Sequence, residues 1–218
     1  TVKARRLKSI LKYVNYAFVL NPDLMNFLPH EKSMFLPYIK QSWFDKVDSK
    51  RLRSGKEFVI VHAPTNRRIK GTDIIIQQVN ALREHYPVRL ILVEGVSHEE
   101  AKKSYLQADL LIDQIRLGWY GGVAVEAMRM GVPVAVYINP ADLKFVPDAM
   151  REAIPGAFLG VDSMNLFERV AELIENPRRY SQLVSAARDY VNRFHDPDRL
   201  VKLVIDKYEE FGGARCLM

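Results

Sequence analysis

Short, nearly continuous apolar runs recur along this chain from residue 57 onward. Apolar runs of about four to eight residues are typical of strands buried on both faces, as in a parallel sheet. The runs, each of which predicts a strand, cover residues 57–63, 88–95, 109–114, 132–138 and 157–161.

Amphipathic segments lie between these runs. In residues 72–83, for example, Ile75, Val79 and Leu82 recur at the spacing of a helix with one buried face. The predicted helices cover residues 72–83, 97–108, 123–130 and 163–175, and two more close the chain. Strands that alternate with helices form a parallel sheet through right-handed crossovers. The pattern therefore predicts an α/β fold with a doubly wound, Rossmann-like sheet, which binds ligands beyond the carboxyl ends of its strands.

The segment before residue 57 follows a different pattern. Residues 1–14 are rich in Lys and Arg and carry apolar residues at helical spacing. This fits either a membrane-surface helix or, more commonly, the solvated basic face of a packed helix. Residues 16–20 predict a short strand, 34–39 an extended segment, and 45–56 a polar linker.

Charge and cysteine content narrow the classes of protein. Lys and Arg number 32 against 26 Asp and Glu, which gives a formal net charge of +6. This mild excess suits anionic small molecules, a membrane surface or nucleic acid and selects none of them. The single Cys216 excludes an internal disulfide and favours a reducing compartment. Since no apolar run approaches the about 20 residues of a transmembrane helix, we expect a cytoplasmic protein, either free or peripheral at the inner membrane face.

The segment HAPTNRRIKGTD, residues 62–73, carries the first candidate chemistry. It follows a predicted strand and opens a predicted helix, whose N-terminus offers free N–H groups and partial positive charge to an anion. The candidates here for diphosphate binding are Thr65, Asn66, Arg67, Arg68, Lys70 and Gly71. A solvated basic loop is the alternative. His62 also lies on this rim, where a core histidine is favoured over a catalytic one.

The segment GWYGGVAVEAMRMGVPV, residues 118–134, contains the second group of candidate binding residues. Two glycines open a predicted helix, and Glu126 lies about one turn into it, where a carboxylate can accept hydrogen bonds from a ribose diol. A favourable charge near a helix N-terminus is the other interpretation of Glu126. The candidates here and after the second strand are Gly95, Val96, Tyr120, Gly121, Gly122, Val123 and Glu126. The strand between them contains Asp109 and Asp113 but no Asp-x-Asp metal motif.

The run Glu126-Ala127-Met128, followed by Gly131-Val132-Pro133-Val134, resembles the nucleotide-binding half of GT-B glycosyltransferases of the family 4 type, also called glycosyltransferase group 1. Lys70-Gly71 matches the phosphate lysine of that family. The resemblance implies a nucleotide-sugar-binding domain at 57–195 and a carboxy-terminal helix at 196–218. It makes residues 1–44 the tail of an amino-terminal acceptor domain, joined through the linker 45–56.

The resemblance also implies a reaction. A sugar would pass from a UDP-, GDP- or ADP-sugar to a glycan or lipid-linked acceptor, with retention of configuration, in polysaccharide biosynthesis. Lys70, Arg68 and Glu126 would be the catalytic residues, and no metal or further cofactor is expected. Because most of the acceptor domain is missing from the chain, we expect it to bind donor without transferring sugar alone.

Two departures from the family pattern keep alternatives open. Gly118 stands where the family has a glutamate that contacts the donor sugar, and Thr65 stands where it has an arginine, so Arg67 or Arg68 would substitute. Gly118 favours a non-catalytic nucleotide-sugar-binding module. A GT-B nucleotide-sugar epimerase would need an acid/base pair that the sequence does not show. Nucleic acid is not an expected partner, since no basic strand face is interleaved with aromatic residues.

Overall fold

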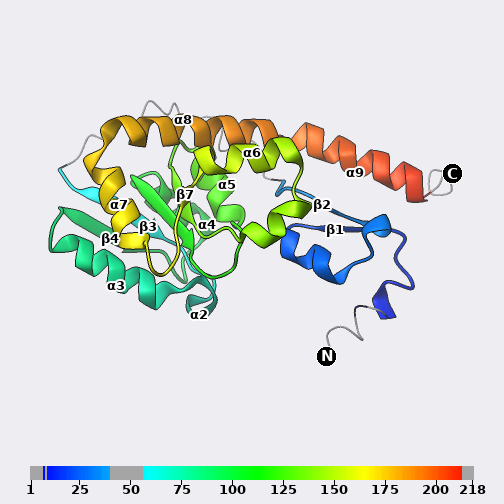
Figure 1. Cartoon of the computed structure of the whole chain (residues 1–218), viewed down its shortest axis with the longest axis horizontal. Helices are drawn as coiled ribbons and strands as arrows, with labels where there is room; N and C mark the ends of the chain where they lie inside the picture. The colour runs from blue at the N-terminus through cyan, green and yellow to red at the C-terminus, as the bar shows by residue number, and fades with distance from the viewer. Residues whose placement is uncertain (1–6, 8, 40–55, 213–218) are drawn as a thin grey trace.

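Five parallel strands form the central sheet of the chain. The structure is a computed structural model that describes residues 7, 9–39 and 56–212 (Figure 1). In their order across the sheet, the strands are β4 (Val88–Leu92), β3 (Phe58–His62), β5 (Leu110–Gln114), β6 (Val134–Val136) and β7 (Leu159–Gly160). Each neighbouring pair is parallel, which confirms the predicted doubly wound α/β fold.

Helices cover both faces of this sheet, because successive strand residues point to opposite faces. Val61 and Leu111 belong to one core, and their neighbours Ile60 and Ile112 to the other. The first face is covered by α4 (His98–Tyr105), α5 (Gly122–Arg129) and α6 (Asp148–Ala157). The second is covered by α3 (Thr72–Arg83) and α7 (Leu166–Glu175). The long helix α8 (Pro177–Phe194) contributes residues to both cores and runs along the top of Figure 1.

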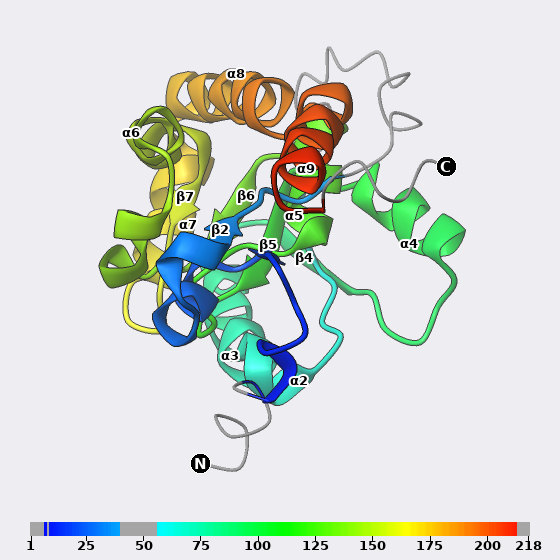
Figure 2. The same ribbon diagram turned by 90° about the vertical axis from the view of Figure 1, so that its right-hand side faces the viewer.

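The tail before residue 40 forms a second, smaller sheet. Its parallel strands are β1 (Ala17–Val19) and β2 (Ser33–Phe35), and the 3-10 helices η1 (Pro22–Phe27) and η2 (His30–Lys32) connect them. The last helix, α9 (Pro197–Gly212), lies beside the tail at the same end of the molecule (Figures 1 and 2). There the Tyr16 ring stacks on that of Phe211, with centroids 4.7 Å apart. Phe35 meets Trp119 edge-on at 5.4 Å, so the tail faces the loops beyond the carboxyl ends of the central strands.

Besides the 3-10 helix η4 (Pro140–Phe145), the described residues form two α-helices that the hydrophobic pattern does not predict. One is α2 (Arg67–Lys70), within the predicted phosphate loop, and the other is α6, which buries Met150, Ile154 and Ala157 although Pro155 lies inside it. Residues 1–6, 8 and 40–55 lie outside the described residues, so the basic amino-terminal helix, the linker and the division into domains stay predictions. None of the described helices is long and apolar enough to cross a membrane.

Candidate functional site

β3 and β5 lie side by side, and the order in which the chain adds strands to the sheet reverses between them. From β3 the chain moves to β4 on one side, and it then returns to place β5 on the other. In doubly wound sheets, ligands bind beyond the carboxyl ends of the strands at this switch point. The loops that follow β3 and β5 here are 63–66 and 115–121. Both candidate segments of the sequence therefore meet at one site.

Lys70 is held at this site by the short helix α2. The Asn66 side chain caps α2 by accepting a hydrogen bond from Ile69 N at 3.0 Å. Gly71 joins α2 to α3 with φ +78°, and a Cβ there would lie 2.6 Å from Ile115 Cγ1, so glycine is needed. The Lys70 carbonyl accepts from Ile115 N at 3.2 Å, which ties α2 to the end of β5.

The Lys70 ammonium contacts a carboxylate of the chain itself. Its Nζ lies 2.5 Å from Asp113 Oδ1, and Asp113 Oδ2 accepts from the Gly121 amide at 2.5 Å. The Asp113 side chain is fully buried and that of Lys70 is 10% exposed. Gly121 is the N-cap of α5, so the carboxylate bridges the lysine and the N-terminus of that helix. Lys70 and the Gly121 amide are predicted to bind the diphosphate of a ligand, but both already bind the Asp113 carboxylate of the chain itself.

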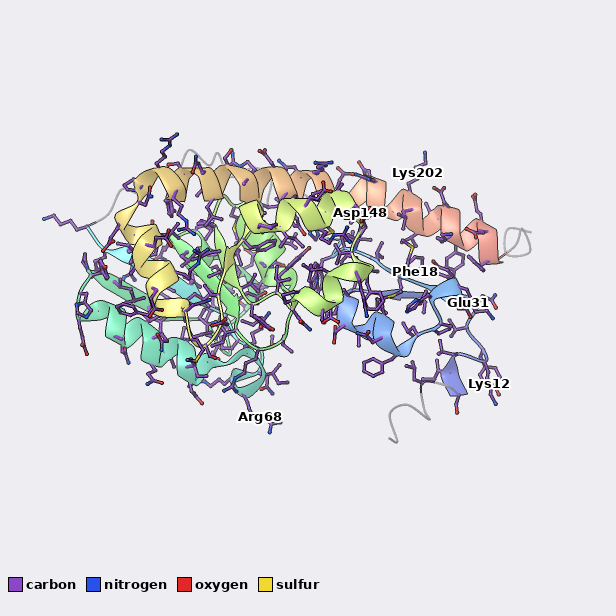
Figure 3. All side chains as sticks on the ribbon, in the orientation of Figure 1. Lys12, Phe18, Glu31, Arg68, Asp148 and Lys202 are labelled. Atoms are coloured by element: carbon purple, nitrogen blue, oxygen red, sulfur yellow. The ribbon has the colours of Figure 1, made fainter. Side chains whose placement is uncertain are left out.

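The two candidate arginines differ in their surroundings. Arg67 donates to both oxygens of Glu94, which follows β4, at 2.9 and 2.5 Å, and this pairing lowers the pKa of the Glu94 carboxyl. Arg68 is exposed and extends from the lower edge of the molecule, away from the sheet (Figure 3). Arg116, a further exposed cation on this rim, donates to the Arg68 carbonyl at 3.0 Å. Sequence reasoning did not single out Arg116.

Two other candidates point into the protein rather than onto the rim. Glu126 is 4% exposed; burial is the main cause that raises the pKa of Tyr105 to about 12, and the charge of Glu126 acts in the same direction. Tyr120 is 1% exposed, and its hydroxyl meets Tyr190 and His195 inside the core. Only the backbone of Tyr120 is therefore available to a ligand, and the ribose role of Glu126 stays a prediction.

The remaining candidates lie at the surface or half-buried on the rim. Thr65 and Asn66 are exposed in the loop after β3, and Gly95 and Val96 are exposed in the loop after β4. Gly122 and Val123 are half-buried in the first turn of α5, where backbone N–H groups have no acceptor within the helix.

Gly118 lies where no larger residue fits without movement. Its φ is +80°, and a Cβ would lie 2.9 Å from Asn139 Cβ. The Gly118 carbonyl also accepts from Asn139 N at 2.9 Å, which fixes the two loops together. A glutamate here, as in the resembled family, would therefore strain the left-handed backbone and require Asn139 to move.

His62 is a core histidine. It is fully buried, its Nδ1 pairs with the Ile112 carbonyl at 2.7 Å, and its Nε2 pairs with Thr72 Oγ1 at 2.9 Å. Burial lowers its pKa. Both ring nitrogens are thus used in joining β3 to β5 and α3.

Solved structures share this architecture. The chain is similar to a sucrose-phosphate synthase from Thermosynechococcus elongatus, with a TM-score of 0.68 and 16% identity, over 98% of this chain and 62% of that one. It is similar to TarM, with a TM-score of 0.61 and 14% identity, over 89% of this chain and 43% of that one. It is also similar to the GtfA/B complex, with a TM-score of 0.62 and 12% identity, over 93% of this chain and 46% of that one.

These neighbours are GT-B glycosyltransferases, and the likeness confirms the predicted fold, the Rossmann-like carboxy-terminal half of GT-B. At such low identities the likeness shows the fold alone. The chain spans between 43% and 62% of the length of these three neighbours. No protein-family model and no curated protein matches it.

Proposed function

We propose that this chain is the donor-binding half of a glycosyltransferase and that it holds a nucleoside-diphosphate sugar across the β3–β5 switch point. The observation that carries the proposal is the position of Lys70 beside the N-terminus of α5, at the carboxyl ends of the strands. The diphosphate would contact the exposed edge of Lys70 and the first-turn amides of Gly122 and Val123. Arg116 adds positive charge to the same rim, and Arg68 would have to turn back towards it from α2.

The chemistry follows from this placement. In the transfer, the bond between the anomeric carbon and the diphosphate oxygen breaks, and its electron pair leaves with the diphosphate. An acceptor hydroxyl of a glycan or lipid-linked glycan forms the new bond to the anomeric carbon, and its proton passes to the departing diphosphate. Preorganised positive charge that stabilises the departing diphosphate can contribute several kcal/mol of the barrier reduction; loss of one oxyanion-hole donor in a protease costs about 2.7–4 kcal/mol. Lys70, Arg68 and the α5 amides would supply it.

We further propose that a second domain binds the acceptor. The tail strands β1 and β2 face the rim, and Asn26 of the tail donates to Asp142, beyond β6, at 3.1 Å. Two strands of three residues are too few to form a stable sheet alone, and large side chains of the tail are exposed, such as Phe27 at 66%. These features fit one edge of a larger domain.

The binding of nucleoside diphosphates tests the proposal. We expect UDP, GDP or ADP to bind more tightly than the matching nucleoside, in calorimetry and in thermal shift. Lys70→Ala should weaken diphosphate binding by about 1–3 kcal/mol, because it removes a charge-assisted hydrogen bond. The control is Lys202→Ala on α9, an exposed lysine at the far side of the molecule (Figure 3). Equal affinity of the native chain and Lys70→Ala would remove Lys70 from the phosphate site.

One observation favours a second candidate, a nucleotide-sugar-binding module without catalysis. At Gly118, where the resembled family has a carboxylate for the donor sugar, the left-handed backbone and the contact with Asn139 disfavour any side chain. Such a module would bind donors through the same diphosphate contacts and transfer nothing. An epimerase is not favoured, since Asp113 is fully buried in an ion pair with Lys70 and Glu94 forms an ion pair with Arg67.

A further inference from the structure

We propose that Asp113 is a built-in counter-anion that competes with the diphosphate for Lys70 and for the N-terminus of α5. It thereby sets the affinity and the ligand selectivity of the site. This inference rests on the proposed function, because the donors that Asp113 occupies are the ones we assign to the diphosphate. Asp113 is not a ligand of the sugar nucleotide in this scheme; it is a residue that determines how strongly the site attracts one.

The contacts of Asp113 are those of an anion bound in a site. One oxygen lies 2.5 Å from the Lys70 ammonium, and the other accepts from the backbone amide of Gly121 at 2.5 Å. Lysine ammonium groups and helix N-terminal amides are also the groups that bind phosphate oxygens.

Burial makes this competition strong. The Asp113 side chain is fully buried and the Lys70 side chain is 10% exposed, so water screens their interaction poorly. The pair has no net charge, and an incoming diphosphate meets a neutralised lysine and a nearby negative carboxylate. The first-turn amides of α5, Arg68 and Arg116 remain to attract it. The native site should therefore bind diphosphates weakly and select ligands whose other groups, such as base and sugar, add affinity.

If Asp113 positions Lys70 for the ligand instead of competing with it, removing the Asp113 charge should change ligand affinity in the opposite direction. If Asp113 only aimed Lys70 at the ligand, loss of its charge would release the lysine and weaken binding. If Asp113 competes, loss of its charge leaves the buried ammonium without a counter-anion, and a diphosphate supplies one. Asp113→Asn separates the two roles, since it removes the charge while an amide oxygen can still accept from Gly121 N–H.

The strand β5 offers a matched control. Asp109 lies just before the other end of this strand, is also buried, and accepts from Val59 N at 2.8 Å. Asp109→Asn removes the same charge about 13 Å from Asp113 along the strand. Since the Lys70 ammonium contacts Asp113, it lies too far from Asp109 to form an ion pair with it. A general effect of lost negative charge would appear in both variants, and a competition for Lys70 in Asp113→Asn alone.

The test measures the affinity of inorganic pyrophosphate and of UDP, GDP and ADP by calorimetry, after circular dichroism has shown that each variant folds. We expect Asp113→Asn to bind pyrophosphate and its preferred nucleotide at least tenfold more tightly than the native chain, and Asp109→Asn to change affinity less than twofold. The gain in affinity should be absent from the double variant Lys70→Ala/Asp113→Asn. If Asp113→Asn does not fold, Asp113→Ser, which also removes the charge, takes its place.

The outcomes separate this inference from the proposed function. Nucleotide binding by the native chain with equal or weaker binding by Asp113→Asn would overturn the competition and leave the donor site standing. Tight pyrophosphate binding by Asp113→Asn, without any preference for nucleotides over pyrophosphate, would support the competition and count against the donor site. Failure of every ligand to bind any of the variants would overturn both.

Discussion

At the scale of single residues, Gly118 and Asp113 decide what the site can hold. Gly118 keeps the rim free of a side chain, and Asp113 fills the position between Lys70 and α5. The placement of Lys70 on the rim could be predicted from its position between a strand and a helix. Its pairing with Asp113 could not, because the contact joins residues 43 positions apart and depends on how β5 lies beside β3. The sequence did contain one indication, because Asp113 lies in the apolar run 109–114 and a buried carboxylate needs a partner.

The backbone at Gly118 gives a prediction about stability. Gly118→Ala should lower the free energy of unfolding by about 2–4 kcal/mol, from the left-handed backbone and the contact with Asn139. The control is Gly156→Ala in α6, where a Cβ meets nothing within 4 Å. That variant should be neutral or gain up to about 1 kcal/mol, because alanine favours a helix. Urea unfolding measures both, and equal stability of the two variants would contradict the strain at Gly118.

At the scale of elements, a buried polar cluster joins the loop before α5, the end of α8 and the tail. The Tyr120 hydroxyl contacts the Tyr190 hydroxyl at 3.0 Å and His195 Nε2 at 2.9 Å, and His195 Nδ1 pairs with the Tyr38 carbonyl at 2.9 Å. The helices themselves were predictable from their apolar spacing. This junction was not, because Tyr120 resembles a rim residue in sequence and only the packing of α5 against α8 turns it inward.

His195 makes this junction sensitive to acid. Burial is the main cause that lowers its pKa from 6.5 to about 4, and the charge of Arg129 acts in the same direction. Between these values the unfolded chain binds more protons than the folded one, so stability falls as the pH falls from 6.5 towards 4. We expect His195 to account for about 2 kcal/mol of stability lost between pH 7 and pH 5.

Unfolding by urea at several pH values checks this contribution. His195→Gln should be less stable at pH 7, because hydrogen bonds to Tyr120 and Tyr38 are lost, but its stability should fall less steeply below pH 6.5. His85→Gln, at an exposed histidine, is the matched control and should keep the native slope. A slope in His195→Gln as steep as that of the native chain would show that other groups govern acid sensitivity; buried His62, whose pKa is also lowered, would be the next to replace.

At the scale of the whole molecule, the fold class was predictable because a parallel sheet buried on both faces leaves a strong pattern in sequence. The order of the strands, β4-β3-β5-β6-β7, was not, since apolar runs do not reveal which strand lies beside which. That order fixes the switch point and therefore the site. The tail was predictable only as fragments, because its strands are three residues long and its contacts with α9 and the rim join distant parts of the chain.

The position of the tail leads to the prediction about activity. Sugar transfer needs donor and acceptor held together with water largely excluded between them. In our proposal the central sheet binds the donor, and the tail, which has exposed apolar side chains such as Tyr13 at 89%, faces the same rim. We therefore expect the isolated chain to bind a labelled sugar nucleotide and to transfer no sugar, and we expect a longer form that carries an acceptor domain before the tail to transfer sugar to cell-derived acceptors.

Two assays decide this, one with the chain alone and one with the longer form, each with the same labelled donors and the same panel of glycan and lipid-linked acceptors. Sugar transfer by the chain alone would contradict the need for a second, acceptor-binding domain. Donor binding by the longer form without transfer, across the whole panel, would favour the non-catalytic module that Gly118 suggests. In that case the measured affinity of Asp113→Asn would still report on the competition between Asp113 and the diphosphate for Lys70.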